Sequence, residues 1–141
     1  MILADLSAIP GRTYPARRRT QNLVGGASPI QATHFALGNV TLEPNGGQVP
    51  WHNQDQEEVY FILEGGGTLV TGGKIVNPKP VPANRSAGPR GEKIEGGVTR
   101  HVSKGDLIII PGRTPHWWSS LDGDLNYMII RPDPEGRIKL K

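Results

Sequence analysis

Short runs of alternating apolar and polar residues recur along this chain, and a period of two is typical of β-strands rather than helices. Residues 33–43 (THFALGNVTLE) are predicted to form a strand with His34, Ala36, Val40 and Leu42 on one face. Further strands are predicted at residues 57–63, 67–71, 98–103, 106–110, 116–120 and 124–131. Many short strands separated by turns predict an all-β sandwich or jelly-roll barrel.

Glycine and proline divide the chain between these strands. The 141 residues include 19 glycines and 13 prolines, with 35% hydrophobic residues, which fits one domain of strands and turns. Glu64-Gly65-Gly66 predicts a tight hairpin between two strands. Residues 73–97 predict a long insertion that forms a mobile flap over or beside the barrel mouth. Residues 1–30 predict an irregular or edge-strand arm, which leaves 31–141 as a single barrel.

Composition and charge exclude several classes of protein. The chain has no cysteine, so disulfides, thiolate metal ligands and cysteine nucleophiles are excluded. Its net charge of +3 is modest, and the basic segments 17–19 and 74–104 lack the interleaved aromatics of a nucleic-acid-binding surface. No apolar run approaches the roughly 18 residues of a membrane span, and the first residues lack a signal-peptide pattern. We therefore expect a cytoplasmic protein without nucleic-acid or membrane partners; a removed leader replaced by Met1 is the alternative.

Four residues form a candidate metal site. His52, Gln54 and Glu58 are evenly spaced, so on an extended strand they project from one face, and His116 would complete the set from elsewhere in the chain. Imidazole, carboxylate and amide donors without thiolate suit iron, manganese, nickel, zinc or copper. The sequence therefore predicts one divalent metal ion bound by these four side chains.

The segments around these residues resemble the two motifs of the cupin superfamily, G(X)5HXH(X)3-4E(X)6G and G(X)5PXG(X)2H(X)3N. Residues that match the first motif are Gly46, His52, Glu58 and Gly65, and residues that match the second are Gly105, Pro111 and His116. The two motifs together span about half of the chain. The resemblance implies a cupin double-stranded β-helix, which is a jelly-roll barrel.

The chain departs from these motifs at three positions. Gln54 stands in place of the second histidine, Arg113 in place of a glycine, and Ser120 in place of the terminal asparagine. Gln54 and His34 together resemble the histidine-plus-glutamine metal sites of a cyclase subgroup of cupins that acts on aromatic polyketides. In the family, N-terminal arms often cross to a partner subunit, so the resemblance also implies a homodimer.

Strand alternation extends the candidate site. Tyr60 and Ile62 share the face of Glu58, and Trp118 shares the face of His116. We predict that Tyr60 hydrogen-bonds a ligand and that Trp118 and Ile62 line its pocket; the alternative is that these side chains are barrel core. Arg113 is a candidate anion clamp at the barrel mouth, or a surface arginine.

His34 adds a further candidate on the strand that precedes the first motif. On the inward face it would be a fifth metal ligand, a general base, or a group that orients a ligand. The alternative is a partly buried structural histidine.

These residues predict a metal-dependent enzyme that acts on a small oxygen-rich organic molecule. With iron, two histidines and one carboxylate favour a dioxygenase-type reaction, which we take as the leading hypothesis. With zinc, manganese or nickel, the site favours isomerisation, elimination by a lyase, or polyketide cyclase-like ring closure. The remaining hypotheses are a non-catalytic small-molecule binder and a degenerate barrel that has lost its metal, since fold does not settle function.

Overall fold

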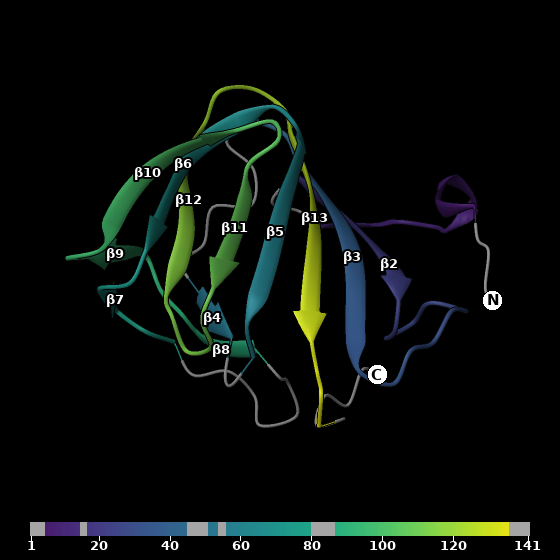
Figure 1. The fold of residues 1–141 in the computed structure, drawn as a ribbon. Helices are drawn as coiled ribbons and strands as arrows, with labels where there is room; N and C mark the ends of the chain where they lie inside the picture. Colours follow the sequence, from purple (N-terminus) through teal and green to yellow (C-terminus); the bar gives the residue numbers. More distant parts are fainter. Residues whose placement is uncertain (1–4, 15–16, 45–50, 54–55, 80–86, 136–141) are drawn as a thin grey trace.

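Two antiparallel sheets face each other in the computed structural model, which describes residues 5–14, 17–44, 51–53, 56–79 and 87–135 (Figure 1). Within these residues the first sheet has six strands, in the order β1 (Arg12–Tyr14), β2 (Arg18–Val24), β3 (Phe35–Leu42), β13 (Leu125–Pro132), β5 (Glu58–Glu64) and β11 (Leu107–Ile110). The second has five, in the order β10 (Val98–Ser103), β6 (Gly66–Thr71), β12 (His116–Leu121), β4 (Trp51–Asn53) and β8 (Ala87–Arg90). The predicted all-β fold is confirmed.

Helix is nearly absent from the described ranges. They contain a three-residue 3-10 helix at Leu6–Ala8, and no helix there is long and apolar enough to cross a membrane. β1 and β2 pair with each other, and β2 pairs with β3, so residues 18–24 extend the six-stranded sheet. The part of the predicted arm that lies at the sheet edge is therefore β1.

The core lies between the two sheets, where alternate residues of each strand meet. On β3 the inward residues Ala36, Val40 and Leu42 are buried, as the alternation in the sequence predicts. The main apolar cluster comprises Val40, Leu42, Tyr60, Ile62, Leu69, Val102, Ile110, Trp118, Leu125, Tyr127 and Ile129. Burial of these side chains is the main source of the free energy of folding.

The predicted hairpin at Glu64-Gly65-Gly66 is wrong. β5 pairs with β13 and β11, whereas β6 pairs with β10 and β12, so the chain crosses from one sheet to the other at this turn. Gly65 has a φ of 77°, and a Cβ atom there would collide with the carbonyl oxygen of Asp124. A tight glycine turn suits a sheet-to-sheet corner as well as a hairpin, and the local sequence does not distinguish them.

In the described parts of the insertion, residues 73–79 and 87–97, the chain forms short strands, and the predicted flap stays a prediction. β7 (Lys74–Val76) and β9 (Lys93–Glu95) pair as a two-stranded ribbon, and β8 pairs with β4 in the five-stranded sheet. Ile75 and Ile94 are buried with Val70, and Trp117 packs against them. These strands are three or four residues long, too short for an alternating pattern to stand out between glycines and prolines.

Several large apolar side chains stay exposed on the outer face of the six-stranded sheet. Leu107 and Ile109 on β11 are each 60% exposed, and Phe61 on β5 is 36% exposed. Leu107 lies opposite Phe61 in the register of the two strands. An apolar face of this kind is compatible with association of subunits, and the homodimer stays a prediction.

Arg113 lies in the loop between β11 and β12 with a φ of 60°. This is the left-handed region, which glycine adopts readily and other residues adopt at a cost. Arg113 also stands where the second cupin motif has glycine. The chain therefore keeps the backbone conformation of a glycine at this position although the residue has changed.

We expect Arg113→Gly to be more stable than Arg113→Ala by about 1 kcal/mol. Both variants remove the arginine side chain, so they differ mainly in whether a Cβ atom occupies the left-handed region. Urea unfolding of the two proteins measures the difference. The same pair of substitutions at Arg100, inside the regular strand β10, should give the opposite order. Equal stability of the two Arg113 variants would contradict the expectation.

Candidate functional site

Three polar side chains are buried together between the sheets. Glu58 is the first residue of β5, His116 is the first residue of β12, and Tyr60 follows Glu58 on the inward face. Their exposed fractions are 0%, 2% and 1%. Buried polar groups of this kind need partners, because an unsatisfied buried carboxylate is strongly destabilising.

Each oxygen of the Glu58 carboxylate has a partner. Oε2 accepts a hydrogen bond from the Tyr60 hydroxyl at 2.8 Å and lies 3.0 Å from His116 Nε2. Oε1 accepts a hydrogen bond from Arg131 Nε at 2.7 Å, on the inward face of β13. The Tyr60 hydroxyl oxygen is also 3.1 Å from His116 Nε2. Glu58 Oε2, His116 Nε2 and Tyr60 Oη therefore converge on one point inside the barrel.

Hydrogen bonding fixes where His116 carries its protons. Nδ1 is 2.9 Å from the carbonyl oxygen of Thr114, which can only accept, so Nδ1 is protonated. The ionised Glu58 carboxylate can also only accept, so the Nε2 contact is a hydrogen bond when Nε2 is protonated as well. The Glu58 carboxylate is thus surrounded by the imidazole of His116, the hydroxyl of Tyr60 and the guanidinium of Arg131.

The environment of the cluster keeps Glu58 charged and Tyr60 neutral. Burial raises the pKa of Glu58, but the hydrogen bond from His116 and the charge of Arg131 outweigh it and hold the pKa at about 2. Burial, followed by the negative charge of Glu58, raises the pKa of Tyr60 well above its ordinary value. At neutral pH the site therefore contains a carboxylate beside a protonated phenol.

Arg131 was missed by the sequence reasoning. It follows Leu125, Tyr127 and Ile129 on the inward face of β13, and those three residues are buried. A charged residue on the inward face of a strand can be recognised in the sequence. It indicates a buried partner of opposite charge, because charged side chains are rarely buried alone. The sequence predicts the strand 124–131, but the candidate site residues do not include Arg131.

Two of the four predicted metal ligands meet in this cluster, and two lie outside the side chains that the structure describes. Glu58 and His116 are in direct contact. His52 lies in β4, which runs beside β12 with Trp51 opposite His116, so its backbone is next to the cluster strand. The side chain of His52 and the whole of Gln54 are outside the described residues.

Of the other predicted site residues, two are buried in the core and two are exposed. Ile62 and Trp118 belong to the main apolar cluster, and Trp118 lies 5.8 Å from Tyr127 between ring centroids. His34 is exposed just before β3, where its carbonyl oxygen accepts a hydrogen bond from the backbone nitrogen of Asp133. Arg113 is exposed in the loop that ends at His116.

Comparison with known proteins identifies the fold. No family model and no curated protein matches this chain. The polyketide cyclase RemF from Streptomyces resistomycificus superposes with a TM-score of 0.62 at 18% identity, over 94% of this chain and 79% of that one. An RmlC-like cupin from Shewanella frigidimarina gives 0.57 at 9% identity, over 94% and 90%. The chain has the cupin fold. A further match, the DMSP lyase DddQ from Ruegeria pomeroyi, gives 0.63 at 19% identity, over 92% of this chain and 58% of that one.

The donor atoms of the Glu58 cluster are of kinds that bind metal ions. In the described part of the chain no group of three His, Cys, Asp or Glu side chains comes together to hold a metal. Glu58 and His116 nevertheless supply a carboxylate oxygen and an imidazole nitrogen that face each other at 3.0 Å. The Thr114 carbonyl holds the far nitrogen of the ring, which is the usual arrangement behind a metal-ligating histidine.

We expect Glu58→Gln to lower the free energy of unfolding of the metal-free protein by on the order of 3 kcal/mol at about pH 6. Because the folded-state pKa of Glu58 is about 2 against an ordinary 4.5, its stabilisation is present above 4.5 and is lost as the pH falls toward 2. The difference between wild type and variant should therefore shrink over that range. Urea unfolding in EDTA at several pH values measures it, with the exposed Glu64→Gln as control. A difference that does not change with pH would count against the network.

Proposed function

We propose that this cupin is a metal-dependent enzyme that acts on a small oxygen-rich organic molecule. The observation that carries the proposal is the buried convergence of Glu58 Oε2, His116 Nε2 and Tyr60 Oη within 3.1 Å of one another. Two of these atoms are metal donors and the third is a proton donor. Perturbed ionisable groups that converge inside a barrel are a common property of reaction centres.

In this proposal His52, Gln54, Glu58 and His116 hold one divalent ion, with Fe, Zn, Mn and Ni as the candidates. Metal binding requires deprotonated ligands, so Glu58 would bind as a carboxylate and His116 through Nε2. When bound, it would supply a Lewis acid that stabilises negative charge on a carbonyl, enol or hydroxyl oxygen.

The surrounding side chains orient these donors. Arg131 holds Oε1 of Glu58, so Oε2 is the oxygen that faces His116. The Thr114 carbonyl keeps a proton on Nδ1 of His116 and directs Nε2 toward the same point. Both contacts fix ligand geometry before any ion or substrate arrives, and such preorganisation strengthens binding.

Tyr60 is assigned the role of general acid. Its raised pKa keeps the hydroxyl protonated at neutral pH, and its oxygen lies beside both metal donors. A substrate oxygen that gains negative charge next to this group would receive a hydrogen bond or the proton from Tyr60 Oη. Proton transfer of this kind suits isomerisation, elimination or ring closure.

Structural likeness to a polyketide cyclase and a DMSP lyase is consistent with this non-redox class. A dioxygenase is the second candidate, favoured by a site in which Glu58 and His116 already touch and His52 lies on the adjoining strand. Two histidines and one carboxylate are the ligand set of many non-haem iron oxygenases.

Metal content separates these classes. We expect His116→Ala and His52→Ala each to lose most of the bound metal in elemental analysis of purified protein. His101→Ala is the matched control, because His101 is exposed and pairs with Asp122 at 2.8 Å on the surface. Stoichiometric iron would favour the oxygenase, and zinc, manganese or nickel the non-redox enzyme. Full occupancy in both site variants would refute the ligand assignment, and an empty wild-type site would favour a non-catalytic binder.

Tyr60→Phe is expected to reduce turnover by about 10²-fold or more while metal content stays at the wild-type level. The substitution removes one hydroxyl group and keeps the ring that packs against Tyr127 at 4.8 Å. Tyr127→Phe is the control, since it removes a buried hydroxyl from the neighbouring ring. Equal turnover of wild type and Tyr60→Phe would show that Tyr60 has a structural role alone.

A further inference from the structure

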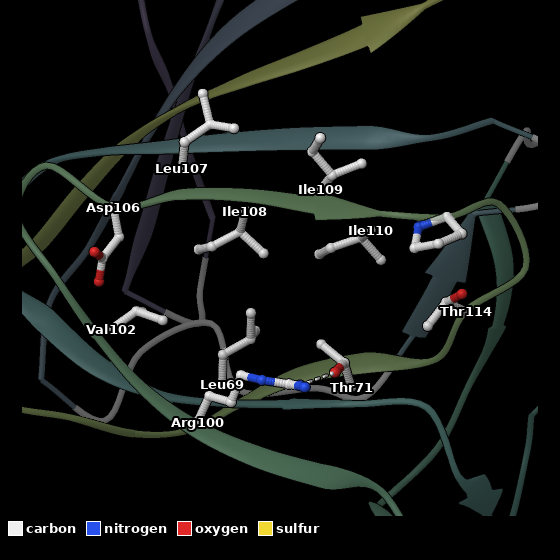
Figure 2. Close-up of a pocket in the computed structure, with 11 residues that line it drawn as sticks. Leu69, Thr71, Arg100, Val102, Asp106, Leu107, Ile108, Ile109, Ile110 and Thr114 are labelled. Atoms are coloured by element: carbon white, nitrogen blue, oxygen red, sulfur yellow. Dashed lines mark hydrogen bonds between the residues drawn. The ribbon is translucent and has the colours of Figure 1, made fainter.

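A pocket lies between the edge strands of the two sheets, and its lining does not include the Glu58 cluster. It has a volume of about 400 Å³ and is enclosed by β11 on one side and by β6 and β10 on the other (Figure 2). β11 ends the six-stranded sheet and β10 ends the five-stranded sheet, so the pocket follows the open seam between them. We call this pocket the seam pocket.

The walls of the seam pocket are aliphatic. Figure 2 shows Ile108 and Ile110 pointing from β11 toward Leu69 on β6 and Val102 on β10. Leu107 points to the opposite side of β11 and belongs to the outer face. From Asp106 to Ile110 the wall extends for about 13 Å, at roughly 3.3 Å per residue. Contact between an apolar ligand and these walls removes apolar surface from water, which favours binding of an apolar ligand body.

The two ends of the seam pocket differ in charge. Arg100 has the same strand parity as Val102 and lies across from Leu69, so it projects over the pocket. Its Nη1 is 3.5 Å from Thr71 Oγ1, a distance at the limit of a hydrogen bond. Asp106 lies at the other end, where its carboxylate accepts a hydrogen bond from the backbone nitrogen of Ser103 at 2.8 Å. The pocket is thus cationic at one end and anionic at the other.

We propose that the seam pocket binds a small amphipathic monocarboxylate, with its carboxylate on Arg100 and its apolar body against Ile108, Ile110 and Leu69. Arginine pairs with carboxylates through two parallel hydrogen bonds. The volume falls within the ~300–1,000 Å³ of ordinary small-molecule sites. Asp106 repels a second anionic group at the far end, so the site discriminates against dicarboxylates.

This site is separate from the reaction centre, although the two share a wall. Ile110 pairs with Glu58 in the strand register, and Thr114, which lines the pocket, holds His116 through its carbonyl oxygen. The residues that line the pocket do not include Glu58, Tyr60 or His116. The proposal therefore does not depend on a bound metal, and it is tested on metal-free protein.

Isothermal titration calorimetry with octanoate, in EDTA and below micelle-forming concentrations, tests the proposal. Wild type should bind one octanoate, and it should bind suberate, the dicarboxylate of equal length, at least tenfold more weakly. Arg100→Gln should weaken octanoate binding roughly tenfold or more, by loss of a charge-assisted pair. Lys104→Gln makes the same change of charge on an exposed residue just beyond β10 and should leave the affinity unchanged.

NMR spectra of the isoleucine methyl groups and of the aromatic rings, recorded on the same samples, locate the ligand. Octanoate should shift the Ile108 and Ile110 methyl signals and leave that of Ile129, on β13, in place. Shifts at the Tyr60 and His116 rings instead, or no binding by wild type, would overturn the proposal.

A charge that points inward on an edge strand can also serve to prevent sheet-to-sheet association. If Arg100→Gln self-associates but binds octanoate with wild-type affinity, Arg100 has that role and the proposal is wrong.

Discussion

The carboxylate of Glu58 is the constraint on which the interior of this barrel depends. A fully buried charge is tolerable only when its oxygens are paired, and here His116, Tyr60 and Arg131 provide the partners. These residues come from β12, β5 and β13, so one ionic network ties strands of both sheets together. Loss of one partner would leave an uncompensated charge inside the barrel. The relative position of the two sheets therefore depends on these contacts.

Much of this arrangement is present in the alternation of residues along the strands. Val40 and Leu42 on β3 are buried as predicted, and so are Glu58 and Tyr60 on β5. The motif spacing predicted that His116 meets Glu58, although 57 residues lie between them, and they are in contact at 3.0 Å. The period-two pattern of each strand specifies which of its faces is buried. The two cupin-like motifs additionally indicate which strands, far apart in the sequence, place their buried faces together.

Other features depend on contacts that the local sequence does not encode. The glycines at 65 and 66 predict a turn but not whether the next strand stays in the sheet, and here it leaves. β7 and β9 are stabilised by Ile75 and Ile94 packing against Val70, a tertiary contact that a three-residue pattern cannot reveal. Arg131 is visible as an inward charge on β13, but its partner is identified only when β13 is known to lie beside β5.

Arg131 also bears on what the proposed centre would bind. Glu58 carries the sole negative charge among the four proposed metal donors, and Arg131 offsets that charge at 2.7 Å. If the neutral side chains of His52, Gln54 and His116 complete the site, a divalent ion would keep most of its charge uncompensated. Electrostatic balance in a buried site would then favour substrates that bring their own negative charge, such as a carboxylate or an enolate oxygen. In the proposed reaction, Tyr60 would donate its proton where negative charge grows on the substrate. The same buried network would then influence both which substrate binds and how it reacts.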